Sequence, residues 1–418
     1  MRREGRGRRP RLQRAIPLNA ITAGRRNRAQ VLEVIQRSGP VSRPFLVQCT
    51  GLASGTISNV VHDLIRLGLV RDTGRFAPRV KSTAGAPSPL LALDGSWHRV
   101  LSIHQGVSRI LIGGHDLAGQ VLAALELPVH RGEAPADAVR RMTAGARRLV
   151  AEQRWTADQV RGIGVGAVGL VDVDAGTVRA APNLGWADVP IRDLLESALG
   201  WPAVVHNNVH AMARGEQRFA GLDEVDAVYV YVGYGIGSGL LTGGHVFRGA
   251  HDAAGEIGHL EVTGGGPCAC GKTGCLETVA AEPAIARRAR RLGGKWAMGD
   301  KEAVGELVHR APNRAECAAL LTDAARALGW ALAQVCEVFD PGVIVVNGIV
   351  AEAGAAFLEP LATALHDATF AAHSREIAVR RASFGRQAGM IGAAAMALDA
   401  FVYSPEADLL IERTRQPA

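Results

Sequence analysis

Three cysteines and one histidine lie close together in a glycine-rich stretch of the chain. Cys268, Cys270 and Cys275 fall within eight residues, and His259 precedes the first of them by nine. Thiolates and imidazole are preferred ligands of Zn²⁺, and four of them complete a tetrahedral structural site. Gly271 allows the chain to turn tightly around an ion. We therefore predict a structural zinc ion held by these four residues. The alternative is a metal-free cluster of buried or redox-active thiols.

A second set of candidate residues lies on a helix expected to begin at Ser54. Ser54 is expected to cap this helix, and Ile57, Val61 and Leu64 recur at helical spacing. The opposite face carries short polar side chains, which can donate to and accept from base edges in a DNA major groove. The predicted DNA contacts are Ser54, Thr56, Ser58, Asn59, His62 and Arg66, with Arg79 and Lys81 added for phosphates.

The elements around this helix have the order of a winged helix-turn-helix. Residues 27–37 carry apolar residues at helical spacing, Ser42 is placed to cap a second short helix, and Gly51 follows its end. Strand-type residues follow the third helix. We predict a DNA-binding domain over residues 21–80 and a linker at 81–90, where small residues, proline and glycine dominate. A three-helix packing module without a DNA role is the alternative.

The charge is unevenly distributed along the chain. Residues 1–90 hold 17 Lys+Arg and 4 Asp+Glu, a net charge of +13. The whole chain carries +7, which leaves −6 for residues 91–418. A basic segment joined to a mildly acidic body is typical of a nucleic-acid-binding domain attached to a domain with another task. Residues 1–20 are expected to form a basic, flexible tail, for which a solubilising role is the alternative.

Composition excludes several classes of protein. With 418 residues, 48% apolar and 21% charged, the chain can form a large core and is not disordered as a whole. Six cysteines are too few for a disulfide scaffold. The chain opens with arginines, and its longest uncharged run, residues 227–247, is broken by six glycines. Neither a signal peptide nor a membrane span is predicted, so we expect a cytoplasmic protein without a membrane partner.

Beyond residue 90, strands and helices alternate, which predicts an α/β fold. The predicted strands are 100–103, 109–113, 120–127, 160–165, 204–205, 228–232 and 343–346. The predicted helices are 136–153, 194–199, 209–217, 284–292, 315–335 and 388–401.

Four short stretches of this body carry a specific combination of motifs. They are GYGIGSG (233–239), GEIGH (255–259), CACGKTGCLE (268–277) and DPGVIVVNG (340–348). Together they resemble the ROK family, named for repressors, open reading frames and sugar kinases. With the N-terminal winged helix, the chain is similar to the transcriptional-regulator branch of that family. The resemblance implies a two-lobed actin/hexokinase-like, ribonuclease H-like domain over residues 91–418, in which sugar binds.

The resemblance also implies a sugar site made of polar residues at loop ends. The family's sugar-contacting positions correspond to Asn207, Asn208, Glu256, His259 and Glu277, with Asn183 and Gly169 as further positions. Carboxylates and amides suit vicinal hydroxyls because they form hydrogen bonds in pairs. On this assignment His259 both ligates the metal and faces the sugar. Solvated loop carboxylates and ordinary turn residues are the alternative.

Two departures from the kinase pattern determine the expected function. Kinases of the family have Asn-Asp where this chain has Asn207-Asn208, and an amide cannot take the proton from a sugar hydroxyl at neutral pH. The family's DxGGT phosphate loop corresponds to HQGVS at 104–108, so His104 replaces the aspartate that helps to organise Mg²⁺-ATP. We therefore expect no catalytic residues.

The expected function is that of a sugar-responsive DNA-binding transcriptional regulator, with repression as the expected mode. The expected partners are a double-stranded DNA operator, a sugar or sugar derivative, and further copies of the chain in a homo-oligomer, either a dimer or a tetramer. An ATP-dependent, glucokinase-like sugar kinase with a fused DNA-binding head is the alternative. A constitutive DNA-binding protein with a vestigial body is a third.

Overall fold

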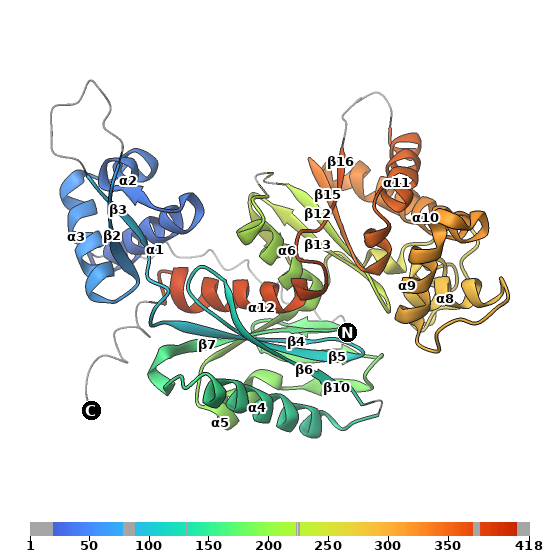
Figure 1. Ribbon diagram of the computed structural model, residues 1–418, viewed down its shortest axis with the longest axis horizontal. Coiled ribbons are helices and arrows are strands. Elements are labelled where there is room, and N and C mark those ends of the chain that lie inside the picture. Colours follow the sequence, from blue (N-terminus) through green and yellow to red (C-terminus); the bar gives the residue numbers. More distant parts are fainter. Residues whose placement is uncertain are drawn as a thin grey trace, which may run out of the picture.

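The computed structural model describes residues 20–77, 88–130, 132–222, 224, 226–370 and 377–407, which form a small head and two larger lobes (Figure 1). Most of the predicted basic tail lies outside the described residues. The predicted phosphate contacts Arg79 and Lys81 and most of the predicted linker also lie outside them. No helix in the described ranges is both long enough and apolar enough to cross a membrane.

The head consists of three helices and a three-stranded sheet. Helix α1 spans Ala20–Ser38, α2 spans Arg43–Thr50 and α3 spans Ser54–Arg66. Strands β1 (Val41–Ser42), β2 (Val70–Phe76) and β3 (Pro89–Leu93) pair antiparallel in the order β1-β3-β2. This is the order and pairing expected of a winged helix-turn-helix.

The helix ends in the head only partly follow the predicted capping. Ser42 caps α2, because its Oγ accepts a hydrogen bond from the Phe45 N–H at 3.4 Å. The prediction that Ser54 caps α3 is wrong: Ala53 holds the extended cap position, and Ser54 is already helical. The Ser54 carbonyl instead accepts from the Ser58 hydroxyl at 2.9 Å.

Strand β3 moves the end of the head beyond the predicted boundary. Leu91 is fully buried and lies opposite Val41 of β1 and Asp72 of β2. Residues 89–93 are therefore part of the head's sheet, past the 81–90 stretch that the sequence predicts as a linker. A short apolar run does not indicate by itself whether it belongs to the domain before it or to the domain after it.

The first lobe is built on a five-stranded sheet of order β11-β7-β4-β5-β6 (Figure 1). Strands β4, β5 and β6 are antiparallel, and β7 and β11 run parallel to β4 and β7 respectively. Its elements are β4 (Arg99–Gln105), β5 (Arg109–His115), β6 (Val121–Pro128), α4 (Pro135–Glu152), β7 (Val160–Ala167), α5 (Ile191–Leu199), β11 (Ala203–Asn207) and the small sheet of β8 (Leu170–Asp172), β9 (Thr177–Ala181) and β10 (Trp186–Val189).

The second lobe repeats this arrangement in the order β14-β13-β12-β15-β16. Strands β12, β13 and β14 pair antiparallel in turn. Strand β15 runs parallel to β12 on its other side, and β16 runs parallel to β15. Its elements are β12 (Ala227–Val232), β13 (Ile236–Thr242), β14 (His245–Phe247), α7 (Glu277–Ala280), α8 (Glu282–Arg290), α9 (Asp300–Arg310), α10 (Ala315–Phe339), β15 (Val343–Asn347), α11 (Ala355–Ala368) and β16 (Ala378–Arg381). The predicted two-lobed α/β fold is confirmed.

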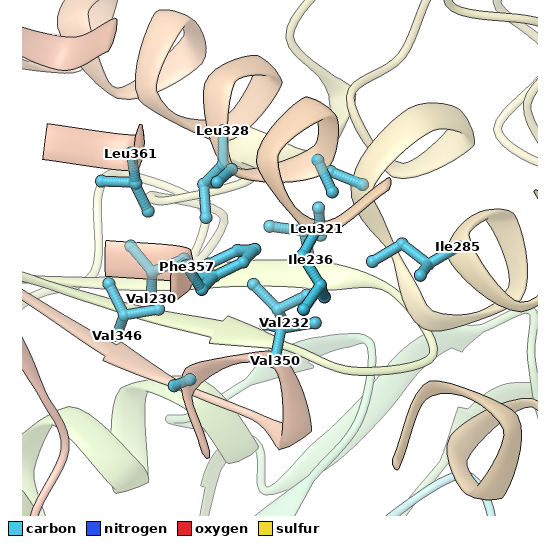
Figure 2. Close-up of a cluster of buried hydrophobic side chains, with 14 of the residues drawn as sticks. Val230, Val232, Ile236, Ile285, Leu321, Leu328, Val346, Val350, Phe357 and Leu361 are labelled. Atoms are coloured by element: carbon cyan, nitrogen blue, oxygen red, sulfur yellow. The ribbon is translucent and has the colours of Figure 1, made fainter. Parts of the chain in front are cut away.

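Each lobe has its own apolar core. In the second lobe, Val230 and Val232 of β12 contact a cluster that includes Phe357 of α11 and Leu328 of α10 (Figure 2). Strands β12 and β15 are buried on both faces, which explains their nearly continuous valine and isoleucine sequences. The first lobe has a separate cluster formed by its sheet, α4 and α5.

Helices α6 (Asn208–Phe219) and α12 (Ala388–Leu398) lie between the two sheets (Figure 1). Glycines allow α12 to approach its neighbours closely. A Cβ on Gly164 of β7 would lie 1.8 Å from the carbonyl oxygen of Ala393, and a Cβ on Gly392 would lie 2.3 Å from that of Ala211. Helix α12 is therefore in backbone contact with the first lobe and with α6.

The far end of α12 leads into the head. A π-helical turn, Asp399–Tyr403, follows the helix, and Phe401 and Tyr403 belong to the same apolar cluster as Ile35 of α1. The Tyr403 hydroxyl donates to the Leu117 carbonyl at 2.6 Å. The head therefore shares a core with the first lobe and is not attached only by a strand.

A buried histidine adds a polar link between the head and the first lobe. His98 is fully buried, and its Nδ1 accepts a hydrogen bond from Arg161 Nε of β7 at 2.8 Å. Its Nε2 then carries the proton and donates to the Leu67 carbonyl, at the end of α3, at 2.9 Å. A hydrogen-bonded chain therefore joins β7 to the C-terminal end of α3.

Candidate functional site

The structure brings the four predicted metal ligands together. His259 ends a 3-10 turn, Ile257–His259, and the three cysteines lie in the loop that follows. The ligand atoms of His259, Cys268, Cys270 and Cys275 all lie within 4.8 Å of one another. Cys268 Sγ is 3.8 Å from His259 Nδ1, and Cys270 Sγ is 3.6 Å from Cys275 Sγ. Four donor atoms at this spacing can hold one metal ion.

Tight turns fix the positions of these cysteines. Gly271 and Gly274 have φ values of +89° and +96°, which only glycine adopts without strain. The Cys268 N–H donates to the Lys272 carbonyl at 2.8 Å and closes the loop. Burial, reinforced by the neighbouring thiols, raises the pKa of the Cys275 thiol to about 12. A bound cation reverses such a shift because it stabilises the thiolate.

Two carboxylates lie beside this cluster. Glu256 directly precedes the turn that carries His259, and Glu277 begins α7. One oxygen of Glu277 accepts from the Ile236 N–H at 2.8 Å, which fixes its orientation. Burial raises the pKa of Glu256, with His259 opposing the shift and the Glu277 carboxylate adding to it. The structure therefore groups Glu256, His259 and Glu277.

The asparagine pair lies at the start of α6. Asn207 Oδ1 accepts from the N–H groups of Val209 and His210 at 2.8 and 3.2 Å, and its Nδ2 donates to the Gly169 carbonyl at 3.0 Å. Gly169 has φ +91°, and a Cβ there would lie 2.2 Å from a carbonyl oxygen. Asn208 is 7% exposed, and its amide forms no hydrogen bond with any residue that the structure describes.

His210 connects these two groups of residues. Its Nε2 donates to the Ala254 carbonyl at 2.9 Å, which ties α6 to the loop that precedes Glu256. Its Nδ1 is buried without a partner in the described structure, and burial lowers the pKa of this histidine. Asn183 lies apart, exposed in the turn between β9 and β10. Within the described ranges, no hydrogen bond or ion pair joins it to the other predicted sugar residues.

The outer face of α3 is polar, as the sequence predicts. Ile57, Val60, Val61 and Leu64 are buried against the head's core. Ser54, Ser58, Asn59, His62 and Arg66 are exposed, and Thr56 is partly exposed. The Arg66 guanidinium lies 3.9 Å from the Asp63 carboxylate one turn earlier. An exposed helix with short polar groups and an arginine can enter a major groove.

A cavity between the lobes contains the predicted phosphate-loop residue His104. It is open to solvent and is also lined by Asn347, Arg109, Lys301 and Arg386. The last three are functional candidates that the sequence does not reveal. They come from β5, α9 and the turn before α12, share no motif, and lie too far apart in the chain for spacing to connect them.

Comparison with known proteins relates this chain to repressors and to sugar kinases. A sequence model of the ROK family matches residues 100–400. The xylose repressor of Caldicellulosiruptor bescii is 27% identical over 391 residues, which cover 91% of this chain and 97% of the repressor. The glucokinase of Halalkalibacterium halodurans is 32% identical over 313 residues, covering 72% of this chain and 94% of the kinase.

A solved structure is similar over nearly the same extent as the repressor. It is a ROK family transcriptional regulator described as a homolog of the Escherichia coli MLC protein. The structures superpose with a TM-score of 0.79 at 24% identity, over 94% of this chain and all of that one. The likeness to the regulators thus extends over the head, whereas the likeness to the kinase is limited to 72% of the chain.

Proposed function

Because the chain belongs to the ROK family, we propose that it is a sugar-responsive DNA-binding transcriptional regulator that acts as a repressor. One observation carries the proposal: the sugar-kinase-like body is joined through a shared apolar core to a winged helix-turn-helix whose third helix presents a polar face. The likeness to a xylose repressor along 91% of the chain supports it. We propose repression as the mode of action because this relative is named a repressor.

We assign operator binding to the exposed face of α3. The residues that meet base edges are Ser54, Thr56, Ser58, Asn59, His62 and Arg66, and Arg79 and Lys81 contact phosphates. A homo-oligomer, a dimer or a tetramer, presents two heads to two half-sites. Because half-site spacing is a geometric requirement, a modest change in the relative position of the heads lowers operator affinity.

The sugar site is formed by Asn207, Asn208, Glu256, His259 and Glu277, with Gly169 and Asn183 at its margin. The contacts support most of this set: Gly169 is bonded to Asn207, and Glu256, His259 and Glu277 interact electrostatically. Sugar binding between the lobes favours their closure, and α12, which contacts both lobes and the head, carries that movement to the DNA-binding face.

The metal is Zn²⁺ in a closed structural site. A tetrahedron with Zn–S bonds of about 2.3 Å has edges of about 3.8 Å. The distances of 3.8 and 3.6 Å between neighbouring donor atoms fit these edges. Bound zinc fixes the loop and the ring of His259. Because Nδ1 faces the cysteines, Nε2 is left to meet the sugar.

The body has no kinase activity in this proposal. Asn208 occupies the position of the general base, and its amide cannot accept a proton. His210 does not replace it, because its Nε2 is bonded to a carbonyl and its Nδ1 has no access to solvent. Purified protein given ATP, Mg²⁺ and a panel of hexoses is expected to release no ADP. Turnover would favour the fused sugar kinase.

The test of the function uses the full chain. An operator is selected from random duplex DNA, and its affinity is measured by fluorescence anisotropy with and without xylose and other unphosphorylated monosaccharides. We expect one sugar to weaken operator binding by about tenfold or more, a coupling of about 1.4 kcal/mol. Arg66→Ala should weaken operator binding by about tenfold, since it removes a base or phosphate contact.

A matched control is Arg37→Ala, which removes an exposed arginine from α1 on the same head. It should leave operator affinity within about twofold, because Arg37 is not one of the proposed DNA contacts. If no duplex is selected, the DNA-binding function is wrong. If operator binding ignores every sugar, the constitutive DNA-binding protein becomes the better description.

A further inference from the structure

One loop of the second lobe reaches the first lobe beside the proposed sugar site. Residues 248–254 follow β14 and end two residues before Glu256. The carboxylate of Asp252 in this loop accepts a hydrogen bond from the Val173 N–H at 3.1 Å. Val173 lies in the turn between β8 and β9, and its side chain packs against the core of the first lobe. This hydrogen bond therefore joins the two lobes.

The turn that carries the donor is held in place by contacts within the first lobe. One carboxylate oxygen of Asp172 accepts from the Ala175 N–H at 2.8 Å, and the other lies 2.8 Å from the Arg179 guanidinium. The Val173 N–H is thus presented from a fixed turn. Its hydrogen bond to Asp252 forms only when the second lobe brings its loop close enough.

The loop that carries the acceptor is also held at its ends. The Ala254 N–H donates to the Arg248 carbonyl at 3.1 Å and closes the loop on itself. The Ala254 carbonyl accepts from His210 Nε2 at 2.9 Å. Burial lowers the pKa of His210, and the Asp252 carboxylate is near enough to oppose that shift. The loop is therefore tied to the start of α6, where the proposed asparagine pair lies.

Asp252 has a backbone conformation that its surroundings must impose. Its φ is +55°, in the left-handed region that residues other than glycine rarely adopt. A residue with a side chain keeps such a conformation only where its contacts outweigh the cost, and such residues are frequent in ligand clamps and switches. The Asp252 side chain is 17% exposed, and it contacts the Val173 N–H and, at 3.4 Å, the Arg248 guanidinium.

The hydrogen bond to Val173 is the stronger of the two contacts between the lobes at this place. The other is an ion pair of the partly exposed Arg248 with the exposed Asp174 of the first lobe, at 3.4 Å. Exposed ion pairs contribute little because water and salt screen them. A backbone N–H bonded to a largely buried carboxylate contributes more, because the acceptor is charged and water is mostly excluded.

We propose that Asp252 is a positioning residue that clasps the two lobes beside the sugar site and thereby sets the sugar concentration to which the protein responds. The inference rests on the proposed function, in which sugar binds between the lobes and favours their closure. A contact that forms only when the lobes are close lowers the free energy of the closed form. Sugar affinity then rises with the fraction of molecules that are already closed.

The first test needs neither sugar nor DNA. Amide hydrogen exchange of the full chain, resolved at Val173 by mass spectrometry, reports on the hydrogen bond itself. Asp252→Gly removes the acceptor, and because glycine adopts this φ without strain the variant is expected to fold. Exchange at Val173 should become about tenfold faster or more. Asp252→Asn keeps an oxygen acceptor in the same place and should retain most of the protection.

The second test measures the response to sugar. The probe is the monosaccharide that weakens operator binding in the anisotropy assay, and its affinity for the full chain is measured by isothermal titration. Asp252→Gly should weaken sugar binding about fivefold or more, as loss of a charge-assisted hydrogen bond does. It should not weaken operator binding without sugar, because the open form is the one that binds the operator. Asp252→Asn should lose less sugar affinity than Asp252→Gly.

Asp188→Gly is the matched control. Asp188 also has a positive φ, +49°, and also pairs with an arginine, Arg179, at 3.2 Å. Both residues belong to the first lobe, so the same substitution removes no contact between the lobes. It should leave exchange at Val173 unchanged and sugar affinity within about twofold, as expected for an exposed ion pair.

Four results would overturn the proposal. They are unchanged exchange at Val173 in Asp252→Gly; sugar affinity of that variant within about twofold of the unmodified chain; an equal loss of affinity in Asp188→Gly; or a loss of Val173 protection in Asp252→Asn as large as in Asp252→Gly. If no sugar bound the unmodified chain, the proposed function would fail, and the role of Asp252 in sugar affinity with it. Exchange at Val173 would still show whether the clasp joins the lobes.

Discussion

In the proposed function, single side chains set the chemistry of the body, while its frame is that of the sugar kinases. At Asn208 an amide lies at the start of α6, buried and without a partner in the described structure. At His104 a neutral imidazole takes the place where an aspartate is expected in a kinase. The cysteine cluster, in contrast, is complete, with all four donor groups within reach of one ion. In the proposed regulator, the groups that bind sugar and metal are retained, and those for proton transfer and for metal–phosphate contact are replaced.

The metal cluster gives a prediction at this scale. Purified protein should contain about one zinc per chain, and Cys270→Ser should lose it because three donors bind far more weakly than four. Plasma emission spectrometry measures the zinc. Removal of zinc by a chelator should loosen residues 255–280 in hydrogen exchange and weaken the sugar response, because His259 and Glu256 lose their support.

Cys49→Ser is the matched control, since this cysteine lies exposed on α2 in the head. It should retain the metal. Zinc content near zero in the unmodified protein, or full zinc content in Cys270→Ser, would contradict the assignment.

Residues that share a short motif could be predicted, and residues that meet only in space could not. The cysteines and His259 lie within 17 positions, so their spacing indicated the cluster. Arg109, Lys301 and Arg386 are separated by more than 80 positions each, and only the packing of two sheets against each other brings them to one cavity. The capping role of Ser54 was misjudged because Ala53 takes the extended conformation first.

Among the elements, α12 is the most constrained. It contacts β7 and α6 at backbone distance because Gly164 and Gly392 carry no side chain. Its own sequence, AGMIGAAAMAL, is made mostly of small residues and is buried along its whole length. Because the backbone of α12 lies this close to the backbones of β7 and α6, an added methyl group has no space there.

A pair of identical substitutions tests this view. Gly392→Ala places a Cβ 2.3 Å from the Ala211 carbonyl oxygen and should destabilise the protein by roughly 1–3 kcal/mol, as overpacking does. Gly305→Ala, within α9, meets nothing nearer than 3.5 Å and should stabilise it by about 0.5–1 kcal/mol through helix propensity. Urea unfolding measures both, and equal effects of the two variants would refute the tight fit.

Elements with strong periodicity were predicted well, and short or mixed ones were not. Residues 136–153 and 315–335 closely match α4 and α10, because long amphipathic or alanine-rich runs favour helix. Helix α9 has Gly305 and charged residues throughout, and β8 has three residues. Such elements are stabilised by their neighbours in the fold rather than by local sequence preference.

In the whole molecule, head and body are coupled by a buried interface. His98 joins Arg161 of β7 to the Leu67 carbonyl at the end of α3, and Tyr403 adds an apolar contact from the end of α12. Helix α3, the proposed DNA-binding helix, is therefore connected to the sheet whose edge strand, β11, ends at Asn207. A change at the proposed sugar site would have a short physical route to the head.

This route predicts the behaviour of His98→Leu. The variant lacks both hydrogen bonds, so the ratio of operator affinities without and with sugar should fall. The fall corresponds to a loss of roughly 0.5–2 kcal/mol of coupling free energy between the two binding events. His115→Leu is the control, because His115 is also fully buried and its hydrogen bonds, to Ser102 and to the Gly119 carbonyl, stay within the first lobe. It should lose stability and keep the ratio. An unchanged ratio in His98→Leu would exclude this link.

The position of β3 has a consequence for how such heads are exchanged between proteins. The central strand of the head's sheet comes after the wing, at Pro89–Leu93, and is the last piece of the head before the body begins. A gene fusion or a proteolytic cut at the small-residue stretch before it would leave β1 and β2 without the strand that joins them. Grafting this head onto another receptor therefore requires a junction after Asp94, whose N–H donates to the Leu69 carbonyl and which is the last residue of this segment with a backbone hydrogen bond to the head.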